Sequence, residues 1–574
     1  MQTLKWKTAS AVTALGICII GAGGINAQAA VTSEKQQAEH ASGVLTMPAG
    51  DSRSAAADSA GNAVNEAPRL SSIPNAELEE LKNLPGDADE GADSMDEARP
   101  STPDQSPKAI STNCAMNGGT GSAPSDVHGA ATPTNIIEVT NSDIMIRNKS
   151  NCALISSMSL RTFFGGFAIP AAETLFDPRV VFDRLAGRCI VIVESRNSGN
   201  TDQFLYIASS RTSSCTTWRN IRFVLSRVST GSLFCKASAA NFYDFPNLGY
   251  NNTRAVVTSN NFTTRTGSFS QATLLSIDKA ALHGTAPVFA KCFRGGSLPF
   301  SMAPAIQGDF GLSMFILSTR AGSGSRISRL RLTPSGSGSG MTDTLTSLSS
   351  IIIPSWTAPP DAPQPNGQKL DTLDGRFQSA SKQIGSVLWN VHAVNSNSRA
   401  RVRLYKVSTS GSLLFLKSLA TAQTGCTGAD HVFNPSVDTN SAQSGSLAFV
   451  TASRTCPSGG AIGRAAHLVF RGPNSSTTDW VFNTIGTSPD QFRILGGSAG
   501  TRPCNTTGTG FRGSCRWGDY SSTQIDPSAP TDAWSFNQLV RTGSLGGSQS
   551  QFNWNTRAGR DTPVIITGVA QAGR

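Results

Sequence analysis

Acidic residues recur where short turns lead into runs of strand-forming residues. Asp177, Asp244, Asp371 and Asp519 each stand at the entrance of such a run. Carboxylates brought together could coordinate Ca²⁺ through their oxygens, or divide the roles of general acid and general base. Asp at a turn also accepts hydrogen bonds from nearby backbone N–H groups. Two interpretations therefore stay open, a ligand-binding rim and repeated turn capping.

Basic residues near the same turns suggest anion binding, because a guanidinium group can bind a carboxylate through two hydrogen bonds. His392 lies in the apolar run "LWNVHAV", where it either reaches a ligand or is a buried core histidine. We predict one ligand-binding rim, and its candidate residues are Asp177, Asp244, Arg376, His392, Arg516 and Asp519.

Motifs of well-known enzyme classes are missing from the sequence. It contains no Walker phosphate-binding loop and no S-x-D-x-G-x-x-W Asp box. Hydrolysis of a glycosidic bond needs two carboxyl groups about 5 to 9.5 Å apart, which spacing in a sequence cannot establish. No catalytic residue is therefore assigned. Ca²⁺ is the one cofactor that the carboxylates suggest.

The elements that must position these residues are β-strands. From about Asn135 the chain consists of short runs rich in β-branched and aromatic residues, such as "RCIVIVES", "QFLYIAS" and "SLAFVTASR". Gly, Ser, Asn and Pro bound these runs, and no long helical pattern intervenes. The sequence therefore predicts an all-β fold.

A turn followed by two strands recurs along the chain with a spacing of roughly 60 to 85 residues. These landmarks begin at Phe176, Tyr243, Phe300, Leu370, Val432 and Arg516. A four-stranded sheet cannot bury both of its faces alone, whereas a ring of such sheets buries them against one another. We predict a β-propeller around a central channel, with seven blades, or six as the alternative.

The stretch "CRWGDYSSTQIDPSAPTDAWSF", residues 515–536, is the last of these landmarks. It predicts the turn and inner strand of the final blade, with Trp517 and Trp534 packed between blades. The run "QFNWNTRAG" near the C-terminus is expected to close the ring together with the first strands of the domain.

Eleven Cys are present, and ten remain once Cys18 is removed with the signal peptide. An even number without any CxxC pair indicates disulfides in an oxidising compartment. We predict two local bridges, Cys426–Cys456 and Cys504–Cys515.

The first residues read as a signal peptide. Lys5 and Lys7 precede an apolar stretch, and Ala27 and Ala29 fit the small-x-small cleavage pattern. We predict a signal peptide at 1–29, an acidic low-complexity linker or propeptide without fixed structure at 30–132, the propeller at 133–565 and a tail at 566–574. Residues 31–110 hold 15 acidic and six basic side chains, although the whole chain has a net charge of +10.

The landmarks resemble those of a family of exported bacterial β-propeller proteins, many of them uncharacterised. The resemblance rests on "FDPRVVFDRLAGR" from Phe176, "YDFPNLGYNN" from Tyr243 and "RWGDYSSTQIDP" from Arg516, and it covers about residues 130 to 565. Cys189 and Leu404 stand where aromatic residues are usual in that family. The resemblance implies the fold and export, but no catalytic residues.

Together these observations predict a protein of the periplasm or the cell exterior, with no membrane span and no specific nucleic-acid partner. The basic body and the predicted rim favour a binding module for a polyanionic or glycan ligand. Two alternatives stay open. One is a hydrolase or lyase that acts on polysaccharide through the rim carboxylates, and the other is a structural protein of the cell envelope.

Overall fold

The computed structural model contains strands and short helices arranged in a ring. It describes residues 31–51, 102–103, 110–116, 124–197, 201–236, 238–264, 267–364, 369–421, 430–443, 446–456, 465–474, 479–488, 494–496, 500–502, 514–515, 517–540 and 554–563.

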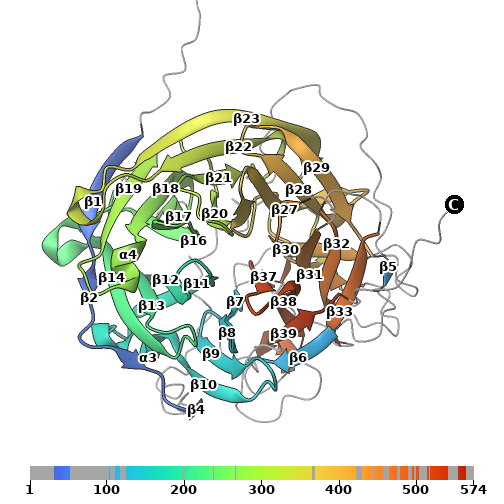
Figure 1. Cartoon of the computed structure of the whole chain (residues 1–574), viewed down its shortest axis with the longest axis horizontal. Helices are drawn as coiled ribbons and strands as arrows, with labels where there is room; N and C mark the ends of the chain where they lie inside the picture. Colours follow the sequence, from blue (N-terminus) through green and yellow to red (C-terminus); the bar gives the residue numbers. More distant parts are fainter. Residues whose placement is uncertain are drawn as a thin grey trace, which may run out of the picture.

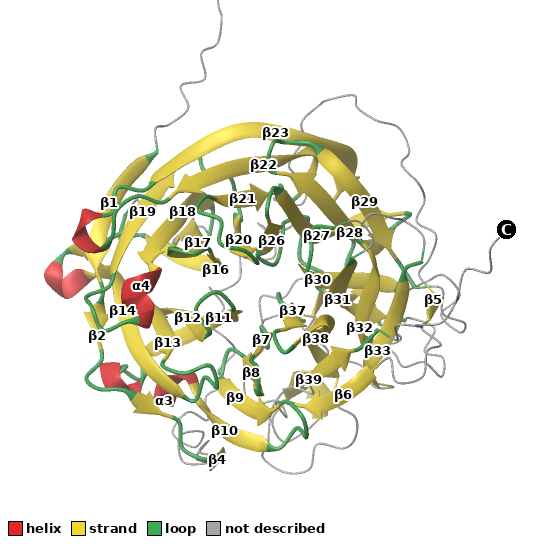
Figure 2. Ribbon diagram, in the orientation of Figure 1, coloured by secondary structure: helices red, strands yellow, loops and turns green. Residues whose placement is uncertain are grey.

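The fold is a β-propeller, as predicted from the sequence. Small sheets stand side by side around a central axis, and their first strands lie closest to the centre (Figure 1). The helices are short and few (Figure 2). Among the described residues they are α3 (Leu160–Phe163), α4 (Lys279–His283) and the 3₁₀ turns η1 (Gly165–Phe167), η2 (Val228–Thr230) and η3 (Gly338–Gly340).

The described strands follow one another in antiparallel groups along the chain. The first three groups are β7 (His128–Ala131), β8 (Asn135–Val139), β9 (Asp143–Asn148) and β10 (Leu154–Ser159); β11 (Glu173–Asp183), β12 (Arg188–Asn197), β13 (Gln203–Ser210), β14 (Thr217–Arg227) and β15 (Ser232–Leu233); and β16 (Asn241–Tyr250), β17 (Arg254–Thr263), β18 (Phe269–Asp278) and β19 (Phe289–Gly295).

Three further groups complete the meander before the chain closes. They are β20 (Ala303–Gln307), β21 (Met314–Ser318), β22 (Ser323–Thr333) and β23 (Thr344–Thr357); β26 (Ser381–Ile384), β27 (Val387–Ser396), β28 (Arg399–Ser408) and β29 (Leu413–Leu419); and β30 (His431–Thr439), β31 (Leu447–Thr455), β32 (Ala465–Pro473) and β33 (Val481–Ser488).

The last group pairs a strand from the N-terminal part of the chain with the C-terminal strands. β37 (Ser522–Asp526), β38 (Ala529–Val540) and β39 (Trp554–Asp561) form a meander, and β6 (Ile110–Ala115) pairs antiparallel with β39. Residues of "QFNWNTRAG" thus do take part in closure. Their partner is a strand from the predicted linker, not the first strands of the predicted domain.

The strand groups are not fully separate in hydrogen bonding. β20 pairs in parallel with both β16 and β26, which joins three groups into one 13-stranded sheet. For this reason the predicted number of blades stays a prediction. Smaller pieces outside the main groups are β24 (Ala362–Pro363), β25 (Lys369–Leu370), β34 (Ile494–Gly496), β35 (Gly500–Arg502) and β36 (Ser514–Cys515).

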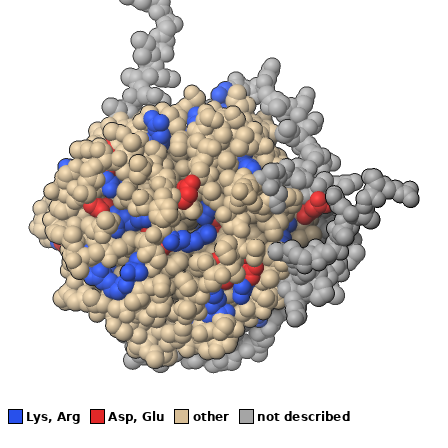
Figure 3. Space-filling view, viewed as in Figure 1, with Lys and Arg blue, Asp and Glu red and all other residues tan. Residues whose placement is uncertain are grey.

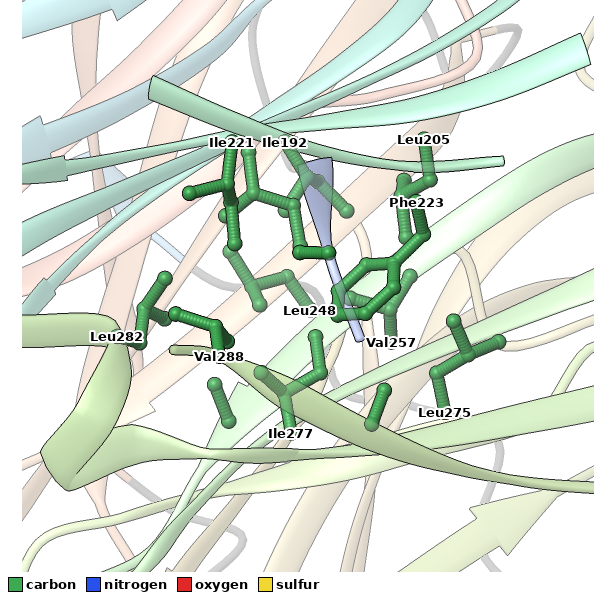
Figure 4. Packing of buried hydrophobic residues seen from close by; sticks show 14 of the residues in the cluster. Ile192, Leu205, Ile221, Phe223, Leu248, Val257, Leu275, Ile277, Leu282 and Val288 are labelled. Atoms are coloured by element: carbon green, nitrogen blue, oxygen red, sulfur yellow. The ribbon is translucent and has the colours of Figure 1, made fainter. Parts of the chain in front are cut away.

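Each sheet is apolar on both faces because it packs between two others. In β12, Ile190 and Ile192 point to one side and contribute to the core shared with β16–β19, whereas Val191 and Val193 contribute to the core on the other side. Alternate residues of a strand face opposite ways, which explains why "RCIVIVES" is a nearly continuous apolar run. Figure 4 shows the first of these cores, between β12–β14 and β16–β18.

The N-terminal segment contributes strands to the sheets. Composition predicts no fixed structure for 30–132, whereas its described parts form short strands on the outer edges of the sheets; the domain boundaries stay a prediction. β1 (Thr32–Gln37) pairs with β19, β2 (Glu39–His40) and β3 (Leu45–Thr46) pair with β14, β4 (Gly50–Asp51) pairs with β10, and β5 (Thr102–Pro103) pairs with β33.

The amino-acid composition of the segment does not reveal this edge pairing. The backbone of an edge strand offers unpaired N–H and C=O groups to any segment that can extend alongside it, and such pairing requires few apolar side chains. Glu39 adds ion pairs with Arg222 and Arg227, at 2.7 and 2.9 Å. The acidic segment therefore binds basic residues of the propeller as an extended strap.

Three disulfides link described residues: Cys114–Cys152, Cys189–Cys215 and Cys235–Cys292. Such bridges persist in an oxidising compartment. Cys456 is also disulfide-bonded. The predicted pairs Cys426–Cys456 and Cys504–Cys515 involve Cys426 and Cys504, which lie outside the described residues. The signal peptide lies outside them too. In the described part of the chain, no helix has the length and apolar character of a membrane span.

Candidate functional site: a carboxyl cluster at the start of the inner strands

Four carboxyl groups gather where the inner strands begin. We call Asp177, Glu194, Asp244 and Asp519 the acidic cluster. Asp177 lies in β11 and Asp244 in β16, each at a register shift that marks a β-bulge. Glu194 lies in β12 and pairs with Phe176 of β11, the residue that precedes Asp177. Asp519 precedes β37, so the ring brings together residues that are more than 300 positions apart in sequence.

The backbone is strained near the starts of several inner strands. Non-glycine residues with positive φ lie within or before the inner strands, at Asp126, Asp177, Phe245, Ser301, Leu373 and Asn434. This conformation is unusual for any residue with a side chain and most unusual for a bulky one such as Phe245 or Leu373. It persists only where surrounding contacts enforce it, and such positions are concentrated at functional sites.

Asp177 is the best-connected member of the cluster. Its Oδ2 accepts hydrogen bonds from the Tyr520 hydroxyl at 2.8 Å and from the Phe245 N–H at 3.0 Å. Burial raises the pKa of Asp177 to about 7, and the charges of Asp244 and Asp519 add to this rise. The hydrogen bond from Tyr520 and the charge of Arg179 oppose it. The Asp177 carboxyl is therefore divided between its acid and base forms near neutral pH.

Asp244 has a buried carboxyl oxygen, Oδ1, with no hydrogen-bond partner among the described residues. Burial raises the pKa of Asp244 well above its ordinary value, and the charges of Glu194 and Asp519 act in the same direction. The positive charges of Arg196 and Arg376 oppose the rise. These effects show that the cluster is crowded with carboxyls and short of compensating cations.

Glu194 repeats this pattern in the neighbouring strand. The Ser259 hydroxyl donates to Oε1 at 2.5 Å, whereas the buried Oε2 has no partner within the described structure. Burial raises the pKa of Glu194 well above its ordinary value; Asp177 adds to the rise, and Arg179 opposes it. A buried oxygen without a partner costs about 1–3 kcal/mol, so it marks a place where water or a ligand is expected.

Arg179 lies across the inner end of the cluster. Its guanidinium carbon is 3.2 Å from the centre of the Tyr520 ring. Nε donates to the carbonyl of Pro246 at 2.7 Å and Nη2 to that of Gln378 at 3.3 Å. Nη1 is buried and has no hydrogen-bond partner among the described residues. This donor adds a third unsatisfied group beside the two unsatisfied carboxyl oxygens.

Arg376 is near the cluster, but another carboxylate already neutralises it. Its Nε lies 2.8 Å and 2.9 Å from the two oxygens of Asp374. Its guanidinium carbon is 4.4 Å from the Phe245 ring centre and 4.6 Å from that of Phe300. The predicted role of Arg376 in anion binding is therefore weakened, because Asp374 occupies the geometry that a ligand carboxylate would need.

Other predicted residues lie elsewhere or serve the fold. His392 is fully buried, with Nδ1 2.6 Å from the carbonyl of Gly375 and Nε2 3.0 Å from the Tyr405 hydroxyl. Burial lowers the pKa of His392 to about 3, as for a core histidine. Asp371 accepts a hydrogen bond from the Leu373 N–H at 2.8 Å, which is turn capping. Arg516 lies outside the described residues.

The tryptophans of the final landmark pack in the core as expected. Trp517 is buried and its indole N–H donates to Ser453 at 3.1 Å; Trp534 is buried and donates to Asp526 at 2.9 Å. Sequence reasoning missed Glu194 and Arg179. Arg179 directly precedes the apolar run 180–182 and Glu194 directly follows the apolar run 190–193, and a charge next to a buried apolar run was the available signal.

The other ends of the inner strands carry carboxylates with close cationic partners. Asp438 lies 2.9 Å from Lys382 and 3.1 Å from Arg184. Although burial alone would raise it, these cations hold the pKa of Asp438 below its ordinary value. Asp526 lies 2.7 Å from Lys149.

Asp183, at the end of β11, has Lys279 as its cationic partner, at 2.8 Å. A ring nitrogen of His283 lies 3.1 Å from the same carboxylate. We call Asp183, Asp438 and Asp526, with these partners, the paired end.

Metal ligands are not clustered at either end among the described residues. Across the part of the chain that the structure describes, no three His, Cys, Asp or Glu side chains come together in a way that could hold a metal ion. The suggested Ca²⁺ stays a prediction without a described set of ligands. Figure 3 shows Lys and Arg gathered near the middle of one face, with fewer Asp and Glu among them.

Comparisons with known proteins do not identify the chain. No family model matches it, and no curated protein does. Among solved structures, it is similar to phage phi92 endosialidase (8% identity, TM-score 0.35, 81% of this chain and 70% of that one). It is also similar to the Dos1 propeller (7% identity, TM-score 0.33, 78% of this chain and 94% of that one). A third similar structure is Trypanosoma rangeli sialidase in complex with sialic acid (11% identity, TM-score 0.31, 67% of this chain and 53% of that one). At these TM-scores the likenesses carry no argument about function.

Proposed function

We propose that this chain is an exported β-propeller that binds a glycan at the acidic cluster. The observation that carries the proposal is the set of unsatisfied buried groups at one place: Asp244 Oδ1, Glu194 Oε2 and Arg179 Nη1. A sugar hydroxyl is both a donor and an acceptor, so it can satisfy a carboxyl oxygen and a guanidinium N–H together. Asp519, which is partly exposed, gives the cluster a side toward solvent.

Export is supported by the signal-like N-terminus and by the disulfides. The charge of the site changes the expected ligand. The cluster holds more carboxyls than free cations, because Arg376 is already bound to Asp374. A polyanion would meet repulsion here, and a glycan without acidic groups would not. A polyanion fits the basic face better, where Lys and Arg gather (Figure 3).

Hydrolysis of a glycosidic bond is the second candidate, favoured by Asp177. A carboxyl with a pKa of about 7 can be a general acid near neutral pH, and nearby carboxyls can supply the base or nucleophile. In such a reaction, protonated Asp177 would give its proton to the leaving oxygen while a second carboxylate activated water. The same residues serve binding and catalysis, so one experiment must separate the two.

The test incubates the purified protein with a panel of neutral, acidic and amine-bearing oligosaccharides. Binding is measured as retention of each oligosaccharide by the protein. Cleavage is measured as new oligosaccharide chain ends, detected by mass spectrometry. Asp244→Asn is compared with Glu39→Gln, a matched change of carboxylate to amide on the N-terminal strap. We expect retention without cleavage, lost in Asp244→Asn and kept in Glu39→Gln.

New chain ends that disappear in Asp177→Asn would replace binding by hydrolysis as the conclusion. Retention that is equal in Asp244→Asn and the unaltered protein would place the ligand away from the acidic cluster. No retention of any oligosaccharide would contradict the proposed function and leave a structural envelope protein as the remaining candidate.

A further inference from the structure

The unsatisfied atoms of the acidic cluster are mostly acceptors. Asp244 Oδ1 and Glu194 Oε2 are buried oxygens without partners, and their residues are 5% and 1% exposed. A hydroxyl donates a single hydrogen, whereas an ammonium group donates three and accepts none. A site with two carboxyl oxygens that lack hydrogen-bond partners therefore suits an ammonium group better than a hydroxyl.

The charges around these oxygens point in the same direction. The charges of Asp244 and Asp519 raise the pKa of Asp177, and the charge of Asp177 raises that of Glu194. The charges of Glu194 and Asp519 raise the pKa of Asp244, so each of these effects destabilises an ionised carboxyl. Without a ligand, the cluster relieves this repulsion by holding protons. A bound cation also relieves the repulsion between the carboxylates. It can therefore replace those protons and allow the carboxyls to ionise.

A metal ion is not the cation that this geometry suits. In the described residues no three acidic, His or Cys side chains are arranged to coordinate one. Ammonium needs hydrogen-bond acceptors but no fixed coordination shell. Arg179 Nη1, a buried donor without a described partner, is available for a hydroxyl or ring oxygen of the same ligand.

We infer that the glycan bound at the acidic cluster carries free amino groups, and that Asp244 and Glu194 receive one of its ammonium groups. This inference rests on the proposed function, and it names the class of glycan. Binding then releases protons from the cluster, because the incoming cation stabilises the ionised carboxyls. Amine-bearing and N-acetylated forms of one oligosaccharide should differ strongly in affinity.

The test uses a β-1,4-linked glucosamine tetramer and the fully N-acetylated tetramer as its matched control. Titration calorimetry of the whole purified protein near pH 6, in two buffers with different ionisation enthalpies, gives both affinity and the number of protons released. We expect the amine form to bind at least about tenfold more tightly, with net proton release. Glu194→Gln should remove most of this preference, and Glu39→Gln should leave it unchanged.

Spermidine serves as a third ligand, because it carries ammonium groups on no sugar. It should bind far more weakly than the glucosamine tetramer if the sugar ring is recognised too. Equal binding of spermidine would overturn the glycan part of the inference.

Equal affinity for the two tetramers would overturn the inference while leaving glycan binding intact. Failure of both tetramers in this titration, together with no retention of any oligosaccharide in the panel, would overturn the proposed function itself. Tight binding of the amine form without any proton release would also contradict the inference, because the cation would not have replaced protons on the cluster.

Discussion

The two ends of the inner strands are built from similar residues and differ in how those residues are partnered. At the paired end, Asp438 has both Lys382 and Arg184 within 3.1 Å, and its pKa is lowered. At the other end, Asp244 and Glu194 have raised pKa values and carboxyl oxygens without described partners. Both sets are buried in the same propeller.

This difference indicates that the two ends of the inner strands have different roles. Ion pairs with additional hydrogen bonds hold neighbouring sheets in place at one end, as when Asp438 also accepts from the Ile525 N–H at 2.8 Å. Crowded carboxyls do not stabilise the fold, so their presence at the other end needs a different explanation. A ligand that supplies the missing hydrogen bonds is such an explanation.

The largest expected effect is at the paired end. Asp438→Asn leaves Lys382 and Arg184 as buried or half-buried cations without their carboxylate. Breaking a buried pair from one side costs about 3–5 kcal/mol, so the free energy of unfolding should fall by that amount. Equilibrium unfolding in denaturant measures it. A loss under about 1 kcal/mol would remove the contrast between the two ends.

Asp177 should make the free energy of unfolding depend on pH in the sense opposite to Asp438, because its pKa is raised and that of Asp438 is lowered. Its folded pKa is raised from 3.8 to about 7, so the folded state holds its proton more tightly than the unfolded chain. Its contribution to stability is complete below about pH 4 and is lost as the pH rises towards 7, on the order of a few kcal/mol. The difference in unfolding free energy between the unaltered protein and Asp177→Asn should therefore decrease over this range.

That comparison is internally controlled, because the other titrating groups are common to both proteins. A difference that stays flat between pH 4 and 7 would show that Asp177 titrates normally in the fold. A difference that grows with pH would show that Asp177 is stabilised as a carboxylate, as Asp438 is.

A smaller effect, of opposite sign, is expected for Glu194→Gln. The amide keeps an oxygen for the Ser259 hydroxyl and removes a group that repels Asp177 when ionised. Stability near pH 8 should be unchanged or higher by up to about 1–2 kcal/mol, measured as a shift in the denaturation midpoint. A loss of several kcal/mol would mean that Glu194 serves the fold after all.

The smallest effect is expected on the N-terminal strap. Glu39→Gln removes ion pairs with Arg222 and Arg227, but the Glu39 side chain is 38% exposed. Solvent-exposed pairs contribute about 0–1 kcal/mol, so thermal unfolding should change little. A large drop in the melting temperature would show that the strap, which composition alone marks as a linker, is a main support of the ring.

The sequence allowed the fold class and part of the site to be predicted. Strand-length apolar runs at a regular spacing pointed to a propeller, and recurring turns singled out Asp177, Asp244 and Asp519. Their gathering at one end follows from ring closure, which brings β37 beside β7, the neighbour of β11, and cannot be deduced from local patterns. Strand pairing by the polar strap was missed for a similar reason, since edge pairing uses the backbone.

Two of the predicted rim residues have partners within the fold. For His392 the sequence left open a ligand-binding role and a place in the core, and its two ring nitrogens contact the Gly375 carbonyl and the Tyr405 hydroxyl in the core. Arg376 was chosen for its charge, and a neighbouring Asp374 neutralises it. Which charges remain without a partner depends on side-chain packing, so this distinction appears only in the structure.

The most direct test of the ligand site measures stability and glycan binding on the same variant, Glu194→Gln. We predict that the variant keeps or exceeds the unfolding free energy of the unaltered protein while its affinity for the bound oligosaccharide falls at least about tenfold. Unchanged affinity in a protein of unchanged stability would contradict the account, because Glu194 would then serve neither the ligand nor the fold.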